Sequence, residues 1–67
     1  MQWLKVIRLG HMKTQADISQ GAYIPQSYYS RIERGEVGES LPVPTAKRIA
    51  AVLGFHWTRF YEEESPQ

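Results

Sequence analysis

Apolar residues recur at helical spacing in five short segments of the chain, and compact turns separate these segments. Trp3, Leu4 and Ile7 share one side of the first segment, and a stripe that includes Ile49 and Leu53 marks the fourth. Strand patterns are absent apart from short apolar pairs. The sequence therefore predicts a compact all-α fold of five helices, over residues 2–9, 14–20, 25–34, 43–53 and 57–62.

Residues that start or stop helices lie between these segments. Thr14 and Asp17 form a shortened capping box at the start of the second helix. Gly21 is expected to cap the end of that helix, and Pro25 is tolerated in the first turn of the third. Met12 is expected to continue the core begun by the first helix. The second and third helices are therefore predicted to meet across a tight turn.

The third predicted helix has one apolar and one polar face. At about 100° per residue, Tyr29 and Ile32 fall on the apolar side and Glu33 at its border. Arginine pairs well with guanine, glutamine with adenine, and serine with bases or phosphates. This face therefore suits DNA, although an ordinary amphipathic surface helix has the same pattern. The residues of the polar face are Gln26, Ser27, Ser30, Arg31 and Arg34.

Charge is distributed unevenly along the 67 residues, whose formal net charge is only +1. Residues 1–34 carry five Lys or Arg against two Asp or Glu, whereas residues 35–67 carry three against five. A basic first half is compatible with a polyanionic partner, although most charge patterns are only solvated surface. We expect one domain over residues 1–62 and a flexible acidic tail over residues 63–67.

Several function classes are excluded by what the sequence lacks. There is no cysteine, and His11 and His56 lie far apart without partners at ligand spacing, so neither a disulfide framework nor a metal site is expected. No nucleophile motif or phosphate-binding glycine loop occurs, which argues against an enzyme, a cofactor or a small-molecule ligand. No apolar run is long enough for a membrane span. A cytoplasmic protein is the expectation.

Two segments resemble the Cro and phage-repressor helix-turn-helix family, also called the XRE family. The stretch SYYSRIERG at residues 27–35 is similar to the recognition helix of that family, and TAKRIAAVLG at residues 45–54 is similar to its fourth helix. The resemblance extends over roughly residues 4–61. It implies a lambda-repressor-like DNA-binding domain in which the second and third helices form the helix-turn-helix.

The same resemblance implies roles for individual residues. Arg8 and Glu33 match a structural ion pair that joins the first helix to the third. Apart from the resemblance, aromatic side chains such as Trp3 are more often core than interface, but a chain of 67 residues can hardly bury all of its aromatics. We therefore expect a dimer interface at Trp57, Phe60 and Tyr61. The expected base contacts are Gln26, Ser27, Ser30 and Arg31, and the expected contacts to the DNA backbone are Gln15, Tyr28 and Arg34.

Some positions depart from the family pattern. Tyr23 stands where the family usually has glycine, which suggests either a left-handed tyrosine or a differently shaped turn. Pro25 replaces the usual serine or threonine cap. The loop over residues 36–42 is acidic, whereas many relatives have Lys or Arg there, so backbone contacts from this loop are in doubt.

Together these patterns predict a sequence-specific transcriptional regulator that binds double-stranded DNA. The expectation is a repressor that binds a palindromic operator as a homodimer, and prophages and other mobile elements are common homes of stand-alone members. The alternative is a protein-interaction module on the same fold, such as an antitoxin or a small partner protein. Salt dependence separates the two hypotheses, because a DNA-binding protein should lose affinity steeply with salt and a protein-interaction module should not.

Overall fold

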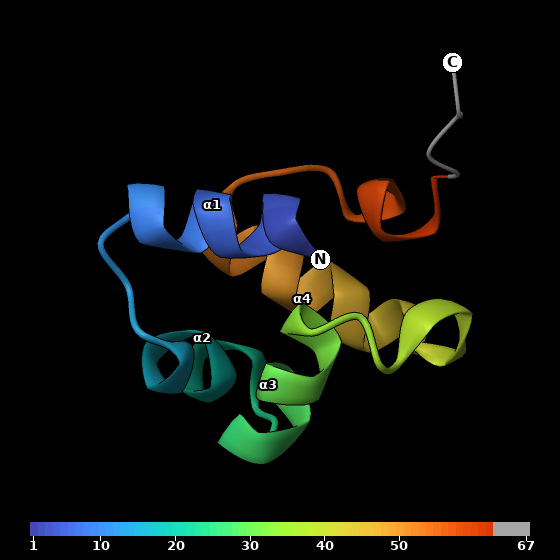
Figure 1. Cartoon of the computed structure of the whole chain (residues 1–67), viewed down its shortest axis with the longest axis horizontal. Helices are drawn as coiled ribbons and strands as arrows, with labels where there is room; N and C mark the ends of the chain where they lie inside the picture. Colours follow the sequence, from blue (N-terminus) through green and yellow to red (C-terminus); the bar gives the residue numbers. More distant parts are fainter. Residues whose placement is uncertain (63–67) are drawn as a thin grey trace.

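A computed structural model describes residues 1–62 of the chain, so the acidic tail predicted at 63–67 lies outside the described residues. Helices and turns make up these residues, which contain no strand, and the predicted all-α class is confirmed. Figure 1 shows α3 at the lower edge of the molecule and the last helical segment, η2, at the upper right. The elements are α1 (Gln2–Gly10), α2 (Gln15–Ala22), α3 (Gln26–Glu33), the 3-10 turn η1 (Gly38–Ser40), α4 (Val43–Leu53) and the 3-10 helix η2 (Trp57–Tyr61).

The start of α2 is fixed by the predicted capping box. The Thr14 hydroxyl accepts a hydrogen bond from the Asp17 amide at 3.1 Å, and the Asp17 carboxylate accepts one from the Thr14 amide at 2.8 Å. These hydrogen bonds lower the pKa of Asp17. Because two otherwise unpaired amides are satisfied, α2 begins at a defined residue.

The end of α2 is a Schellman turn in which Tyr23 takes the place usually held by glycine. Its backbone is left-handed, with φ 60° and ψ 42°. The Ile24 amide donates to the Ser19 carbonyl at 3.0 Å and the Tyr23 amide to the Gln20 carbonyl at 3.3 Å, which is the Schellman pattern. Of the two alternatives raised by the sequence, the structure has the left-handed tyrosine.

The end of α1 repeats this arrangement with Met12. Its φ is 58°, and the Lys13 amide reaches back to the Arg8 carbonyl at 3.3 Å. In this conformation the Met12 side chain points outward and is 92% exposed. The expectation that Met12 continues the core was therefore wrong, because the left-handed turn directs it away from the protein.

Gly21 does not cap α2 but lies inside its last turn. A Cβ atom at this position would lie 2.8 Å from Cγ2 of Val52 in α4, closer than real Cβ contacts allow. The predicted role for Gly21 was wrong, because glycine is needed here for the close approach of α2 to α4.

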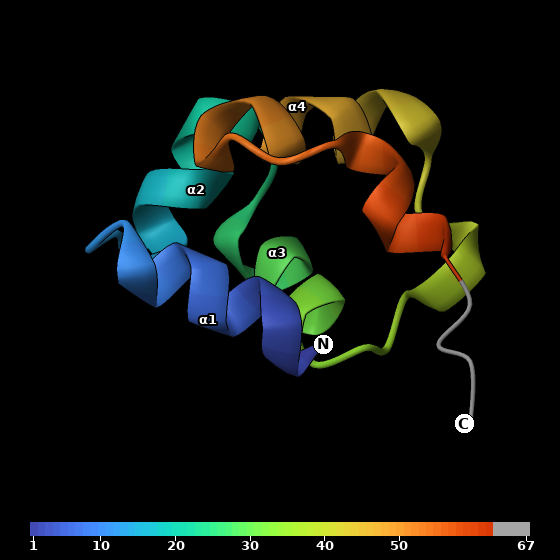
Figure 2. The same ribbon diagram turned by 90° about the horizontal axis from the view of Figure 1, so that it is seen from above.

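Apolar side chains from all four α-helices meet in one core. Leu4, Ile18, Tyr29, Ile32 and Ile49 are among its most deeply buried members. Figure 2 shows α3 between α1 and α4 when the molecule is seen from above. α3 packs chiefly against α2 and also against α1, while Gln26, Ser27 and Arg31 on its other side are exposed.

An aromatic cluster joins η2 to the start of α1. The rings of Trp3, Phe55 and Phe60 lie with centroids 5.3 to 5.4 Å apart. The guanidinium of Arg59 covers the Trp3 ring at 4.5 Å. This packing holds the 3-10 helix η2 against α1 and α4, where the sequence predicts a last short helix.

Candidate nucleic-acid interface

The turn between α2 and α3 sets the direction of the third helix. Pro25 precedes α3 in an extended conformation. Its carbonyl accepts a hydrogen bond from the Tyr29 amide at 3.1 Å, which is the first α-helical (i to i−4) hydrogen bond of α3. Proline is tolerated here because the first amides of a helix have no partner inside the helix. No side chain caps the start of α3.

One side of α3 is anchored and the other is open. Tyr29 and Ile32 are buried, and Tyr28 is half-buried. We call the open side the reading face. Ser30 is half-buried, and the other members are exposed. The reading face consists of Gln26, Ser27, Ser30, Arg31 and Arg34.

A buried ion pair braces the back of α3 against α1. Arg8 donates to Glu33 through Nε at 2.8 Å and through Nη2 at 3.0 Å, and both side chains are at most 9% exposed. Gln15, at the start of α2, donates to the same carboxylate at 3.1 Å. The structure thus brings Arg8, Gln15 and Glu33 together, and one carboxylate links the first three helices.

The charges of this pair stabilise each other. Burial by itself would raise the pKa of Glu33, but hydrogen bonding to its carboxylate, led by Arg8, lowers that pKa below its usual value. Hydrogen bonding to Glu33 raises the pKa of Arg8. Burial, followed by the influence of Glu33, raises the pKa of the neighbouring Tyr29 hydroxyl. All three groups therefore keep one protonation state near neutral pH.

Two residues that matter for the site were not singled out in the sequence. Arg48, in α4, donates through Nε to the Ala22 carbonyl at 2.8 Å and so caps the end of α2. Glu36 forms ion pairs with Arg34 at 2.9 Å and with Arg31 at 3.7 Å. The only signal in the sequence for Glu36 was the acidic character of its loop.

The sequence of this chain matches the model of a known protein family. The sequence model of a family described as helix-turn-helix matches residues 4–60, which include all four α-helices except the first two residues of α1. The chain belongs to the XRE-type helix-turn-helix family. The predicted membership and the placement of the motif on α2 and α3 are confirmed.

A curated relative of this helix-turn-helix chain is the uncharacterized HTH-type transcriptional regulator YqaF of Bacillus subtilis (strain 168). It is 40% identical over 62 residues, which cover 92% of this chain and 79% of the relative. No solved structure matches the chain. The relationship therefore extends across nearly the whole helix-turn-helix domain.

The three aromatic residues predicted for a dimer interface lie in different surroundings in this helix-turn-helix domain. Phe60 is 7% exposed and packs in the core with Trp3, so it offers little surface to a partner. Trp57 is half-buried beneath the Lys47 ammonium, and the Tyr61 hydroxyl donates to the Leu41 carbonyl at 2.6 Å. Only Trp57 and Tyr61 keep partly open surfaces. A dimer interface formed by these residues stays a prediction.

Two further observations concern the described residues. No helix within residues 1–62 has both the length and the hydropathy needed to cross a membrane. Within the same range, no group of three or more His, Asp or Glu side chains is placed to hold a metal ion.

Proposed function

We propose that this protein is a transcriptional regulator that reads double-stranded DNA by placing α3 in the major groove. The proposal rests on one observation above all. Buried residues hold α3 rigidly from behind, and its open side presents only polar and basic groups. Preorganised side chains lose less conformational entropy on binding, so such a helix suits recognition.

The reading face supplies the expected chemistry for base recognition. Arg31 is suited to guanine, and Gln26 to adenine, because each can form two hydrogen bonds to those base edges. Ser27 and Ser30 have hydroxyls that both donate and accept. We propose that these four residues contact bases.

The flanks of the reading face suit the phosphate backbone. Gln15 lies at the start of α2, where the helix dipole and the first-turn amides that Thr14 does not cap favour an anion. Tyr28 borders the reading face, and Arg34 lies at the C-terminal end of that face. We propose that these three side chains position the protein on DNA through phosphate contacts, which carry no sequence information themselves.

We further propose that two copies bind a palindromic operator as a homodimer and repress transcription in a bacterial or phage-infected cell. Two recognition helices about 34 Å apart read successive major grooves on one side of a duplex. The supporting observation is that Trp57 and Tyr61 lie on η2, which is separated from α3: Figure 1 shows α3 at the lower edge of the molecule and η2 at the upper right. A dimer formed through η2 leaves both reading faces open.

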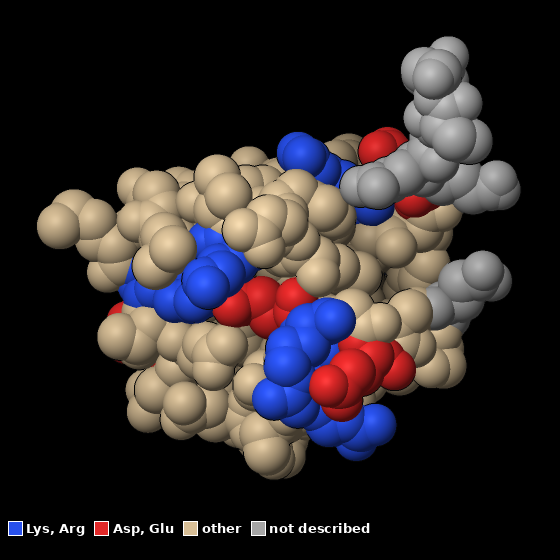
Figure 3. All heavy atoms as spheres, viewed as in Figure 1, with Lys and Arg blue, Asp and Glu red and all other residues tan. Residues whose placement is uncertain are grey.

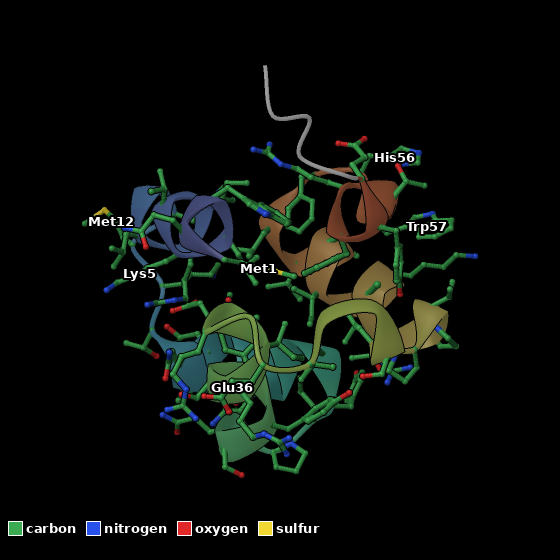
Figure 4. All side chains as sticks on the ribbon, turned by 45° about the vertical axis from the view of Figure 1, so that its right-hand side comes forward. Met1, Lys5, Met12, Glu36, His56 and Trp57 are labelled. Carbon is green, nitrogen blue, oxygen red and sulfur yellow. The ribbon has the colours of Figure 1, made fainter. Side chains whose placement is uncertain are left out.

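The second candidate function is a protein-interaction module. It is favoured by exposed apolar residues along one edge of α1, where Val6 is 60%, Leu9 54% and Met12 92% exposed. Figure 4 shows Met12 at this outer end of the molecule. Such an edge would contact a protein through apolar burial, and its binding would depend little on salt.

Selection of binding sites from a random duplex library, followed by affinity measurements at two salt concentrations, tests the proposed function. We expect an enriched inverted repeat with half-sites about one helical turn apart, and steep loss of affinity with salt. Absence of DNA binding would favour the protein-interaction module.

A further inference from the structure

Glu36 lies against both arginines of the reading face. Its Oε2 is 2.9 Å from Nε of Arg34, and its Oε1 is 3.7 Å from Nε of Arg31. About half of each of these side chains remains exposed. Figure 3 shows acidic atoms directly beside the lower group of basic side chains, and Figure 4 shows Glu36 over α3.

The backbone fixes this position of Glu36. Gly35 is left-handed with φ 80°, its amide donates to the Ile32 carbonyl, and the Glu36 amide donates to the Arg31 carbonyl, both at 2.9 Å. These two hydrogen bonds form a Schellman turn at the end of α3. The turn folds residue 36 back over the last turn of the helix, so the carboxylate meets the arginines as a consequence of the fold.

The contact leaves part of each arginine available. The closest approach to Glu36 is through Nε, whereas the two Nη groups carry donors at the outer tip of the guanidinium. Arginine can use donors at that tip for O6 and N7 of guanine. An arginine can therefore keep its carboxylate partner while it reads a base.

Binding to random DNA has different requirements. It depends on net positive charge facing the phosphates and on the counterions released there. A carboxylate between Arg31 and Arg34 cancels part of that charge and repels nearby phosphates. The same side chain therefore weakens non-specific binding without blocking contacts to bases.

Building on the proposed DNA-binding function, we propose that Glu36 is a specificity-determining residue that holds Arg31 for base contacts and suppresses the binding of Arg31 and Arg34 to non-specific DNA. Its substitution should change the ratio of the two affinities. Substitution of Arg31 or Arg34 is expected to lower the affinity for both kinds of DNA, because each arginine attracts the phosphates of both.

The test compares Glu36→Gln with wild type on two duplexes, one carrying the selected site and one of random sequence. We expect affinity for the random duplex to rise about three- to tenfold, and the logarithmic salt slope on it to steepen by about one. Affinity for the selected site should change about twofold or less, so the ratio of specific to non-specific affinity falls.

Glu62→Gln is the matched control, since Glu62 is also exposed but follows η2 rather than α3. An equal gain in this control would show a general effect of net charge and would overturn the role of Glu36. The double variant Arg34→Ala/Glu36→Gln adds a second check, because most of the gain should disappear without Arg34. A full gain in the double variant would also overturn the proposal.

The outcome also separates this inference from the proposed function. If wild type binds the selected site but Glu36→Gln leaves the affinity ratio unchanged, only the role of Glu36 fails. If wild type binds neither duplex, the proposed function fails and the role of Glu36 fails with it. Circular dichroism melts of each variant show whether folding is intact.

Discussion

The two sides of α3 use the same chemistry in opposite environments. On the buried side, Arg8 and Glu33 form a doubly hydrogen-bonded pair that is almost hidden from water. On the open side, Arg31 and Arg34 meet Glu36 with about half of each side chain in solvent. Water and salt weaken the outer contacts but hardly reach the inner one. The inner pair therefore belongs to the architecture, whereas the outer contacts can adjust when a ligand arrives.

Removal of the buried carboxylate should have the largest effect. Glu33→Ala leaves Arg8 buried without its partner and should lower the free energy of unfolding by about 3–5 kcal/mol. Urea unfolding followed by circular dichroism measures this loss. The matched variant Glu36→Ala, on the open side, should change stability by no more than about 0.5 kcal/mol. Equal effects of the two variants would contradict the distinction between the two sides.

Acid should reversibly reduce the stability that the ion pair of Arg8 and Glu33 contributes, and the loss should be smaller than that caused by Glu33→Ala. The folded-state pKa of Glu33 is lowered, so its contribution to stability is fully present above the unfolded carboxyl pKa of about 4.3 and is lost as pH falls through the folded value. The stability difference between wild type and Glu33→Gln should therefore narrow as the pH is lowered from 6 toward 2, about the range of carboxyl titration. A difference that stays constant over this range would show that ionisation of Glu33 does not stabilise the fold.

Substitution on the open side should affect binding rather than folding. Arg31→Ala should cost about 1–3 kcal/mol on the selected site and relax the preference at one base position. Competition binding with single-base variants of the site measures both effects, and a thermal melt should match that of wild type. An equal loss on random DNA would make Arg31 a phosphate contact instead.

The smallest effect is expected at the turn that leads into α3. Tyr23 is left-handed and 85% exposed, so replacing it by glycine removes backbone strain and few contacts. Tyr23→Gly should stabilise the protein by up to about 1 kcal/mol. The thermal midpoint measures the gain, and Tyr23→Ala is the control because alanine keeps the strain. A lower midpoint for the glycine variant would mean that the tyrosine side chain stabilises the turn.

The parts of the fold that depend on local signals were predictable. The helix expected over residues 43–53 has those bounds in the structure, and the capping box of Thr14 and Asp17 is present. Helical periodicity and cap chemistry act within a few residues, so they can be read from one segment at a time. The burial of Tyr29 and Ile32 followed from the same periodicity.

Features that depend on two distant segments were not predictable in the same way. Gly21 is explained by Val52, which lies on another helix, and Phe60 is buried because Trp3 reaches it from α1. The position of Glu36 depends on the Schellman turn at Gly35, whose geometry places the carboxylate next to Arg31. A sequence pattern shows that these residues are glycine, aromatic or acidic, but their partners appear only once the helices are packed.

Amide chemical shifts recorded by nuclear magnetic resonance during titration with the selected duplex test the central claim most directly, because they locate the bound surface residue by residue. We expect the largest changes on Gln15 and on residues 26–34, with small changes in η2. Changes concentrated at Val6, Leu9 and Met12, with α3 unaffected, would contradict recognition of DNA by the open side of α3.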